Sequence, residues 1–135
     1  MRRARTALLG LLLLGMAPAA ALAAPSDEAS ADAARVAAAF GNTVTSTYPD
    51  GRSQKIWLHP DGAWTGLSRA GTSLAGAWRV KDDKVCLRQK SPPTLPVSLC
   101  IPLPQDARVG VTWMSKDFSG TPIRLRLAPG SGLGN

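Results

Sequence analysis

Apolar and polar side chains alternate along most of the chain from Asn42 onward, which is the period of a β-strand with one buried face. In residues 74–81, LAGAWRVK, the leucine, one glycine, the tryptophan and the valine share one side, opposite alanine, arginine and lysine. Eight such segments follow one another: TVTSTY, SQKIWLH, AWTGLS, LAGAWRVK, KVCLRQK, PVSLCI, RVGVTWM and PIRLRLA. The alternation assigns Val97 and Val109 to the core side of the sixth and seventh segments.

Turn signals separate these segments, and the triplet Pro-Asp-Gly occurs twice, at 49–51 and at 60–62. Short connections imply antiparallel neighbours, so an up-and-down meander of about eight strands is predicted. The fold class is therefore all-β with one N-terminal helix, and residues 42–128 are expected to close into a small β-barrel. A two-sheet β-sandwich is the alternative. Because one strand separates them, the two Pro-Asp-Gly turns should lie at opposite ends of the barrel.

A different period precedes the strands. The stretch EASADAARVAAAF, residues 28–40, is rich in alanine and repeats its apolar residues with helical spacing. The expected apolar face consists of Ala29, Ala33, Val36, Ala37 and Phe40. Gly41 follows, where a helix commonly ends in a left-handed residue. Residues 24–41 are therefore predicted to be an N-terminal segment with an Ala-rich helix that docks on the barrel.

The first 23 residues have the pattern of a signal peptide, with a basic head, a Leu-rich run and Ala-Leu-Ala before the cleavage point. The apolar run is too short to span a bilayer, which needs about 20 residues. We therefore expect export through a cleaved signal peptide to the periplasm or the extracellular space, and no integral membrane segment. At the other terminus, residues 129–135, PGSGLGN, are rich in glycine and are expected to be a flexible tail.

Charge and cysteines agree with export. The whole chain carries a formal charge of +7, and loss of Arg2, Arg3 and Arg5 leaves 13 basic against 9 acidic side chains, or +4. This mild excess does not indicate a nucleic-acid partner. Two cysteines in an oxidising compartment predict one disulfide, Cys86–Cys100. The two residues are equally far from the Ser-Pro-Pro loop, so a hairpin places them opposite each other.

Residues with catalytic chemistry are sparse. His59 is the single histidine and Glu28 the single glutamate, and no serine lies in a nucleophile-type turn. With both cysteines in the disulfide, no thiol nucleophile is left, and two cysteines with one histidine do not make a zinc site. We therefore expect no catalytic residue, no metal and no cofactor, and predict that the protein is not an enzyme.

Aromatic and basic side chains supply the candidate binding residues. Trp64, Trp78 and Trp113 fall on the apolar side and are expected to fill the core, although a ligand pocket lined by them is the alternative. Trp57 alternates with Ile56 and Leu58 and is expected to be exposed on the outer face. Exposed aromatic residues are enriched at binding sites. The candidate binding residues on this face are Trp57, His59, Lys55, Arg124 and Arg126.

The residues of the first strands are similar to a known pattern. Gly41-Asn42-Thr43, the two Asp-Gly turns, Gly76 to Val80 (Gly-x-Trp-x-Val) and Cys86-Leu87 resemble a family of small, exported, uncharacterised bacterial proteins. The resemblance covers about residues 40–90 and implies export and fold, without an activity. Gly76-x-Trp78 is also similar to the motif of lipocalin-like and metalloprotease-inhibitor barrels, where it lies near the first strand.

These observations lead to one leading hypothesis and two alternatives. The leading hypothesis is an exported, non-enzymatic binding module of the bacterial cell envelope, a monomer that binds or inhibits another envelope protein. The first alternative is a carrier that holds a small apolar ligand inside the barrel. The second is a binder of anionic glycans or lipid headgroups through the basic outer face.

Overall fold

The computed structural model describes residue 15 and residues 27–131. The predicted signal peptide and the end of the predicted tail lie outside these residues, apart from Gly15. One helix precedes eight strands, in the order α1 Asp27–Ala37, β1 Thr43–Thr47, β2 Ser53–Leu58, β3 Ala63–Leu67, β4 Ser73–Lys81, β5 Lys84–Ser91, β6 Ser98–Pro102, β7 Thr112–Lys116 and β8 Pro122–Ala128.

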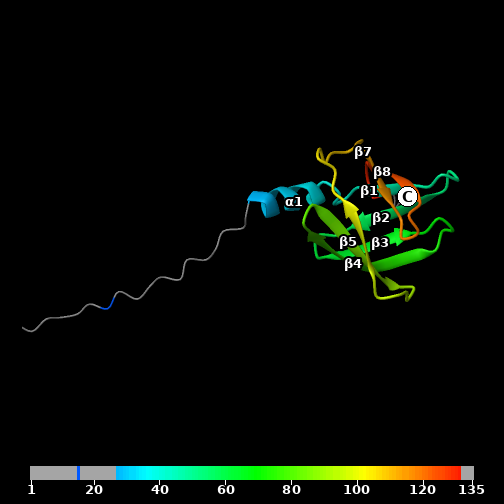
Figure 1. The fold of residues 1–135 in the computed structure, drawn as a ribbon, viewed down its shortest axis with the longest axis horizontal. Coiled ribbons are helices and arrows are strands. Elements are labelled where there is room, and N and C mark those ends of the chain that lie inside the picture. The colour runs from blue at the N-terminus through cyan, green and yellow to red at the C-terminus, as the bar shows by residue number, and fades with distance from the viewer. Residues whose placement is uncertain (1–14, 16–26, 132–135) are drawn as a thin grey trace, which may run out of the picture.

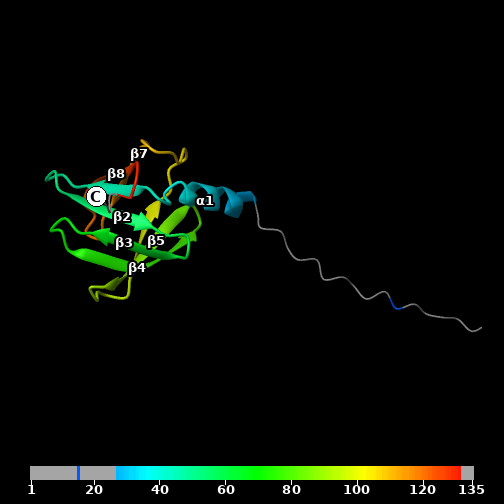
Figure 2. The same cartoon turned by 180° about the vertical axis from the view of Figure 1, so that it is seen from behind.

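All eight strands belong to one antiparallel sheet, in the order β6-β5-β4-β3-β2-β1-β8-β7. The sheet curves into a nearly closed barrel (Figures 1 and 2), so the barrel prediction is confirmed over the sandwich. The helix lies at one end, which we call the helix end. The β1–β2, β3–β4, β5–β6 and β7–β8 connections lie at the other, which we call the open end. The first Pro-Asp-Gly turn is at the open end and the second at the helix end, as predicted.

The two Pro-Asp-Gly turns have the backbone that their composition indicates. Gly51 and Gly62 have φ values of 82° and 88°, which a residue without a Cβ adopts readily. In each turn the glycine N–H donates to the carbonyl three residues earlier, at 2.9 Å to Tyr48 and 3.1 Å to His59. These residues therefore serve as chain reversals between neighbouring strands.

Backbone pairing does not close the sheet into a complete barrel. Its first and last strands, β6 and β7, are not paired with each other, and they contact each other only marginally. At the helix end the indole Nε1 of Trp113 donates to the carbonyl oxygen of Pro102 at 2.9 Å, from β7 to β6. We call the boundary between β6 and β7 the seam. It is tied at the helix end by this side chain rather than by backbone pairing.

The core occupies the barrel interior and consists of the inward-facing aliphatic residues of the strands together with Val36 and Ala39. Leu125 and Ile123 are the most completely buried, at 0% and 2% exposure. Trp64, Trp78 and Trp113 all belong to this core or pack against it, as predicted. Each of these indoles donates its N–H to a backbone carbonyl, which removes the penalty of burying an unpaired donor.

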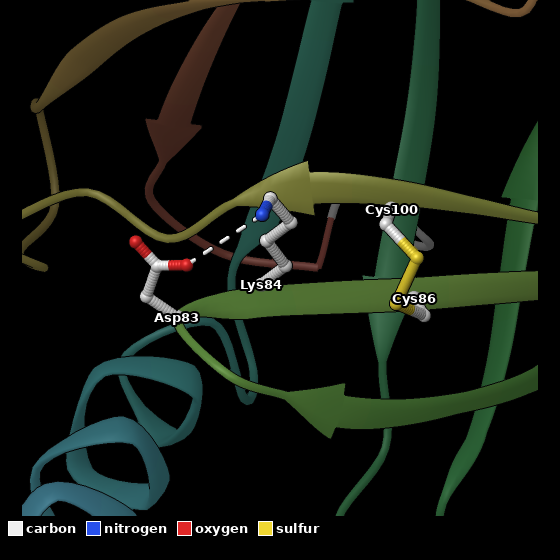
Figure 3. The surroundings of a disulfide bond; sticks show 4 residues. All are labelled: Asp83, Lys84, Cys86 and Cys100. Carbon is white, nitrogen blue, oxygen red and sulfur yellow. Dashed lines mark ion pairs between the residues drawn. A yellow bond between two sulfur atoms is a disulfide. The ribbon is translucent and has the colours of Figure 1, made fainter.

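The predicted disulfide is present (Figure 3). Cys86 on β5 and Cys100 on β6 are direct cross-strand partners and form the Cys86–Cys100 bond. Both lie between inward-facing residues of their strands, so the bond is on the outer face of the barrel, as the alternation indicates. It covalently joins an end strand of the sheet, β6, to the neighbouring strand β5.

The helix is shorter than predicted, and its buried face is different. It ends at Ala37, and the next residues form a tight turn in which Ala39 N donates to Val36 O at 3.0 Å. This turn rotates Ala39 into the core, while Ala33 and Ala37, predicted to be buried, are exposed. Val36 is buried and Phe40 packs against the core, as predicted, but the buried side of the helix is that of Asp32 and Val36, which turns Ala33 and Ala37 toward solvent. The left-handed conformation expected at Gly41 is present, with φ of 74°.

Two strands begin later than predicted. Val97 and Val109 are 49% and 44% exposed rather than in the core, because β6 starts at Ser98 and β7 at Thr112. Pro96 cannot donate to a ladder, and Gly110 has φ of 95°, outside the β region. Val97 therefore belongs to the open end, and Val109 to the long loop at the helix end.

Candidate functional site

Three of the predicted binding residues share one surface. Lys55 on β2, Arg124 and Arg126 on β8 are exposed on the outer face. The register brings them together through β1, since Thr45 pairs with both Lys55 and Arg126, and Thr47 pairs with Arg124. Within residues 27–131 none of the three basic groups makes an ion pair. The outer face over β2, β1 and β8 is therefore basic, with threonine hydroxyls between the charges.

Trp57 is not exposed, and this prediction is wrong. The residue lies outside the interior cluster, as its alternation indicates, but only 3% of its surface is exposed. Its Nε1 donates to Thr43 Oγ1 at 2.8 Å, and the Thr43 hydroxyl donates to the Gly130 carbonyl oxygen at 2.7 Å. Gly130, expected in the flexible tail, also donates its N–H to Asn42 Oδ1. The chain after β8 therefore returns to the start of β1, which strand alternation cannot reveal.

We expect Trp57→Phe to lower the free energy of unfolding by at least about 1 kcal/mol, the usual net value of one buried hydrogen bond, because the smaller phenyl ring lacks the indole donor and leaves unfilled volume. Urea unfolding followed by circular dichroism measures it. Lys55→Ala, on the same face of the same strand but exposed, is the control and should change stability by less than about 0.5 kcal/mol. Equal stabilities of the Trp57 variant and the wild type would show that the indole has no structural role.

His59 is half-buried at the end of β2 rather than free in solvent. Its Nε2 lies 3.0 Å from Thr65 Oγ1, and its carbonyl oxygen accepts the Trp78 indole N–H at 2.8 Å. Both contacts hold His59 in place at the turn between β2 and β3. Lys55 and His59 share the outer side of β2 with Trp57, but Trp57 between them is covered, so the five predicted residues do not form one continuous site.

The barrel interior at the helix end is filled. Val36 and Ala39 from the α1 segment pack against Leu58, Val85 and the other inward-facing residues there. The remaining cavity is about 40 Å³ and almost wholly apolar. A volume of this size holds at most a few water molecules, and an almost wholly apolar lining binds them poorly. Phe40 extends the cover by packing on Trp78, with 5.8 Å between ring centroids.

The open end is different, because it contains a cavity of about 390 Å³. We call it the mouth cavity. Its walls are the inward-facing residues Ile56, Trp64, Leu87 and Leu99, and Gln54 and Gln89 are its polar groups. Its rim is formed by Thr94, Leu95 and Val97 of the β5–β6 loop and by Phe118 of the β7–β8 turn. This volume is within the range of pockets that bind small molecules or single side chains of a partner.

Exposed apolar residues are concentrated on this rim. Leu95 is 73% exposed, Phe118 67% and Val97 49%. Isolated exposed apolar side chains are ordinary, but three around one apolar cavity form the kind of patch that marks a binding surface. The large side chains therefore continue the apolar surface of the cavity out into solvent.

The turn that carries Phe118 is held by Asp117. Its carboxylate accepts hydrogen bonds from Ser119 N, Ser119 Oγ and Thr121 N, at 2.7–2.9 Å. These bonds, with the Ser119 hydroxyl as the largest contribution, lower the pKa of Asp117 below its ordinary value. The turn is therefore organised around an ionised carboxylate, and it presents Phe118 outward beside the cavity.

Two further turns at the open end are linked by Arg69. Its guanidinium lies over the Tyr48 ring, 3.8 Å from the centroid, and 3.6 Å from Asp50. Burial, followed by the charge of Asp117, raises the pKa of Tyr48. The hydrogen bonds that the Arg52 backbone and side chain donate lower the pKa of Asp50. This contact joins the β1–β2 and β3–β4 turns, so the open end has an ordered edge.

The sequence offered a pocket lined by tryptophans only as an alternative, of which Trp64 lines the mouth cavity, and the rim residues were not predicted. Leu95 and Phe118 lie in Pro- and Gly-containing connections, which the alternation treats only as turns. The available signal was chemical, since solvated turns favour polar residues and here each contains a large apolar side chain. Gln54 and Gln89, polar residues at inward-facing positions, were a second sign that the interior is not closed at this end.

The described residues were searched for a metal-binding cluster and for a membrane-spanning helix. Within residues 27–131 no three His, Cys, Asp or Glu side chains are grouped to hold a metal ion. No helix in that part of the chain has the length and apolar composition to cross a membrane.

Comparisons of the chain with models of protein families, with characterised proteins and with solved structures find no match. The function is therefore argued from the geometry of the open end.

Proposed function

We propose that this protein is an exported, non-enzymatic binding module of the cell envelope that binds another protein through its open end. The observation that carries the proposal is the mouth cavity with its exposed apolar rim. A partner inserts an apolar side chain into the cavity, against Trp64 and Leu99, and covers Leu95 and Phe118 at the same time. Apolar anchors that fill a pocket inside a desolvated ring are typical of the energetic centre of protein interfaces.

The rim favours a protein over a small molecule. A ligand confined to about 390 Å³ would fill the cavity but leave Leu95 and Phe118, at 73% and 67% exposure, in water. Covering these side chains removes apolar surface from water, and each Å² that is buried stabilises the complex by roughly 25 cal/mol. The carrier hypothesis uses the same cavity without this gain, so we place it second. The basic row of Lys55, Arg124 and Arg126 supports attraction of an acidic partner rather than a site of its own.

Photo-crosslinking in cells of the natural host tests the proposal. A benzophenone amino acid is placed at position 95, 118 or 109, of which the last replaces Val109, an exposed apolar residue at the helix end. We expect a defined protein adduct from positions 95 and 118 and none from 109. Leu95→Asp should reduce the adduct at position 118 at least tenfold, whereas Val109→Asp should leave it unchanged.

Two results would contradict the proposal. Adducts of equal yield from all three positions would indicate non-specific contact with the envelope. No protein adduct, together with a small added mass on the purified protein in native mass spectrometry, would identify the protein as a carrier instead. Both aspartate variants replace exposed side chains, so their thermal unfolding should match that of the wild type, which separates loss of binding from loss of fold.

A further inference from the structure

The seam leaves two strand edges without partners beside the mouth cavity. Among the strands that the structure describes, β6 pairs only with β5, and β7 pairs only with β8. Within residues 27–131 no backbone hydrogen bond joins Ser98–Pro102 to Thr112–Lys116. Trp113 ties the seam at the helix end, so the unpaired edges continue toward the open end. Unpaired strand edges present rows of N–H and C=O groups that can pair with an added strand.

The mouth cavity lies on the inner side of this seam. Leu99 of β6 is one of its walls, and Phe118, two residues after β7, is on its rim. Side chains alternate along a strand, so every second residue of a strand added at the seam would point inward toward Leu99 and Phe118. The residues between them would point outward.

Basic residues flank the seam on its outer side. Lys116 is exposed on β7, and Arg124 is the cross-strand partner of Met114 on β8. On the other side, Arg88 of β5 is the cross-strand partner of Ser98. In residues 27–131, none of these three basic groups makes an ion pair. The outward residues of an added strand would therefore lie beside Lys116 and one strand away from Arg124 and Arg88, which favours acidic side chains.

We propose that the partner contributes an extended segment that adds as a strand at the β6–β7 seam, with alternating apolar and acidic residues. This inference rests on the proposed function and specifies the partner's chemistry. The apolar residues enter the mouth cavity, and the acidic ones lie beside Lys116 and one strand away from Arg124 and Arg88. Pro96 and Pro102 bound the usable edge of β6, and Met114–Lys116 is the part of β7 on the open-end side of the Trp113 tie, so about three to five residues of the partner pair with the seam.

Short synthetic peptides with the wild-type protein test this inference. The probe is a labelled peptide with a five-residue core of alternating valine and glutamate, and binding is measured by fluorescence anisotropy at low salt. Three matched peptides have lysine in place of glutamate, the same residues in blocks, or N-methyl groups on alternate backbone nitrogens. We expect the lysine, block and N-methyl peptides to bind at least tenfold more weakly, because strand addition needs charge, alternation and backbone donors together.

Variants of the protein locate the added strand. Lys116→Glu should weaken binding of the glutamate peptide at least fivefold, whereas Lys81→Glu, an equal charge change at an exposed residue where β4 ends at the helix end, should weaken it less than twofold. Amide exchange by NMR should slow in β6 and β7 when the peptide is added. Equal effects of the two variants would overturn the proposal in favour of general charge attraction.

Other outcomes separate this inference from the proposed function. Equal binding of the N-methyl peptide, or no binding of the glutamate peptide up to about 1 mM, where a free energy near −4 kcal/mol would still be detected, would overturn strand addition. If crosslinking at positions 95 and 118 still captured a protein, the open end would remain the binding site. A contact made by side chains alone would then replace strand addition.

Discussion

Gly76→Ala is expected to lower the free energy of unfolding by at least about 3 kcal/mol, the upper end of the usual penalty for overfilling a packed core. A Cβ at this position would lie 2.0 Å from the Arg88 carbonyl oxygen and 2.6 Å from Trp64 Nε1. The first contact is with backbone, at the point where the β4–β5 register shifts between Ala75 and Gly76. The two strands must therefore separate, because no rotamer change relieves the clash.

The neighbouring residue provides the control. Ala77 faces the outer side of the same strand, and Ala77→Ser should change stability by less than about 0.5 kcal/mol. Guanidinium unfolding followed by tryptophan fluorescence, with the disulfide intact, measures both variants. Because Trp64 is a wall of the mouth cavity, the Gly76 variant should also bind the glutamate peptide less well. A Gly76→Ala protein as stable as the wild type would show that β4 and β5 are not held as closely as described.

Leu125→Ala is expected to destabilise the protein by about 3 to 5 kcal/mol. Leu125 has no exposed surface and lies inside the barrel between its cross-strand partners Ser46 and Trp113. Truncation removes the transfer free energy of the lost methyl and methylene groups and leaves a cavity that a closed sheet cannot easily collapse. It also removes packing beside Trp113, which ties the seam.

Arg124→Ala is the matched control for Leu125, since it is the adjacent residue of β8 and faces solvent. It should change the free energy of unfolding by less than about 0.5 kcal/mol. The midpoint and the slope of guanidinium unfolding are measured together, because an altered slope would indicate a changed unfolded or native state rather than a lost contact. A small effect at Leu125 would mean that the interior is loosely packed there as well as at the open end.

The fold could be predicted from the sequence because its signals are local. Alternation of period two indicates strands, and Pro-Asp-Gly indicates their reversals. Consecutive strands are paired everywhere except between β6 and β7, so the predicted β5–β6 hairpin already placed Cys86 opposite Cys100. The tryptophans on the apolar side were correctly assigned to the core for the same reason. In each case the deciding contacts join residues close in sequence.

The candidate site was not predicted, because it depends on segments that are distant in sequence. Trp57 was expected on the surface, yet Thr43 and the returning chain at Gly130 enclose its indole. Leu95 and Phe118 come from different connections and meet only because the barrel curves until β6 approaches β7. No local sequence pattern indicates that Trp57 is covered or that Leu95 and Phe118 line the same cavity.

The sequence by itself determined the class of structure: an N-terminal helix, about eight antiparallel strands, a disulfide between two neighbours, and a basic outer face. These follow from backbone geometry and from the period at which side chains alternate. Only the tertiary structure decided that the helix end is filled while the open end retains a cavity of about 390 Å³. The physical reason is closure, because the curvature of the whole sheet sets which interior residues meet, how much space remains between them, and that β6 and β7 stay unpaired.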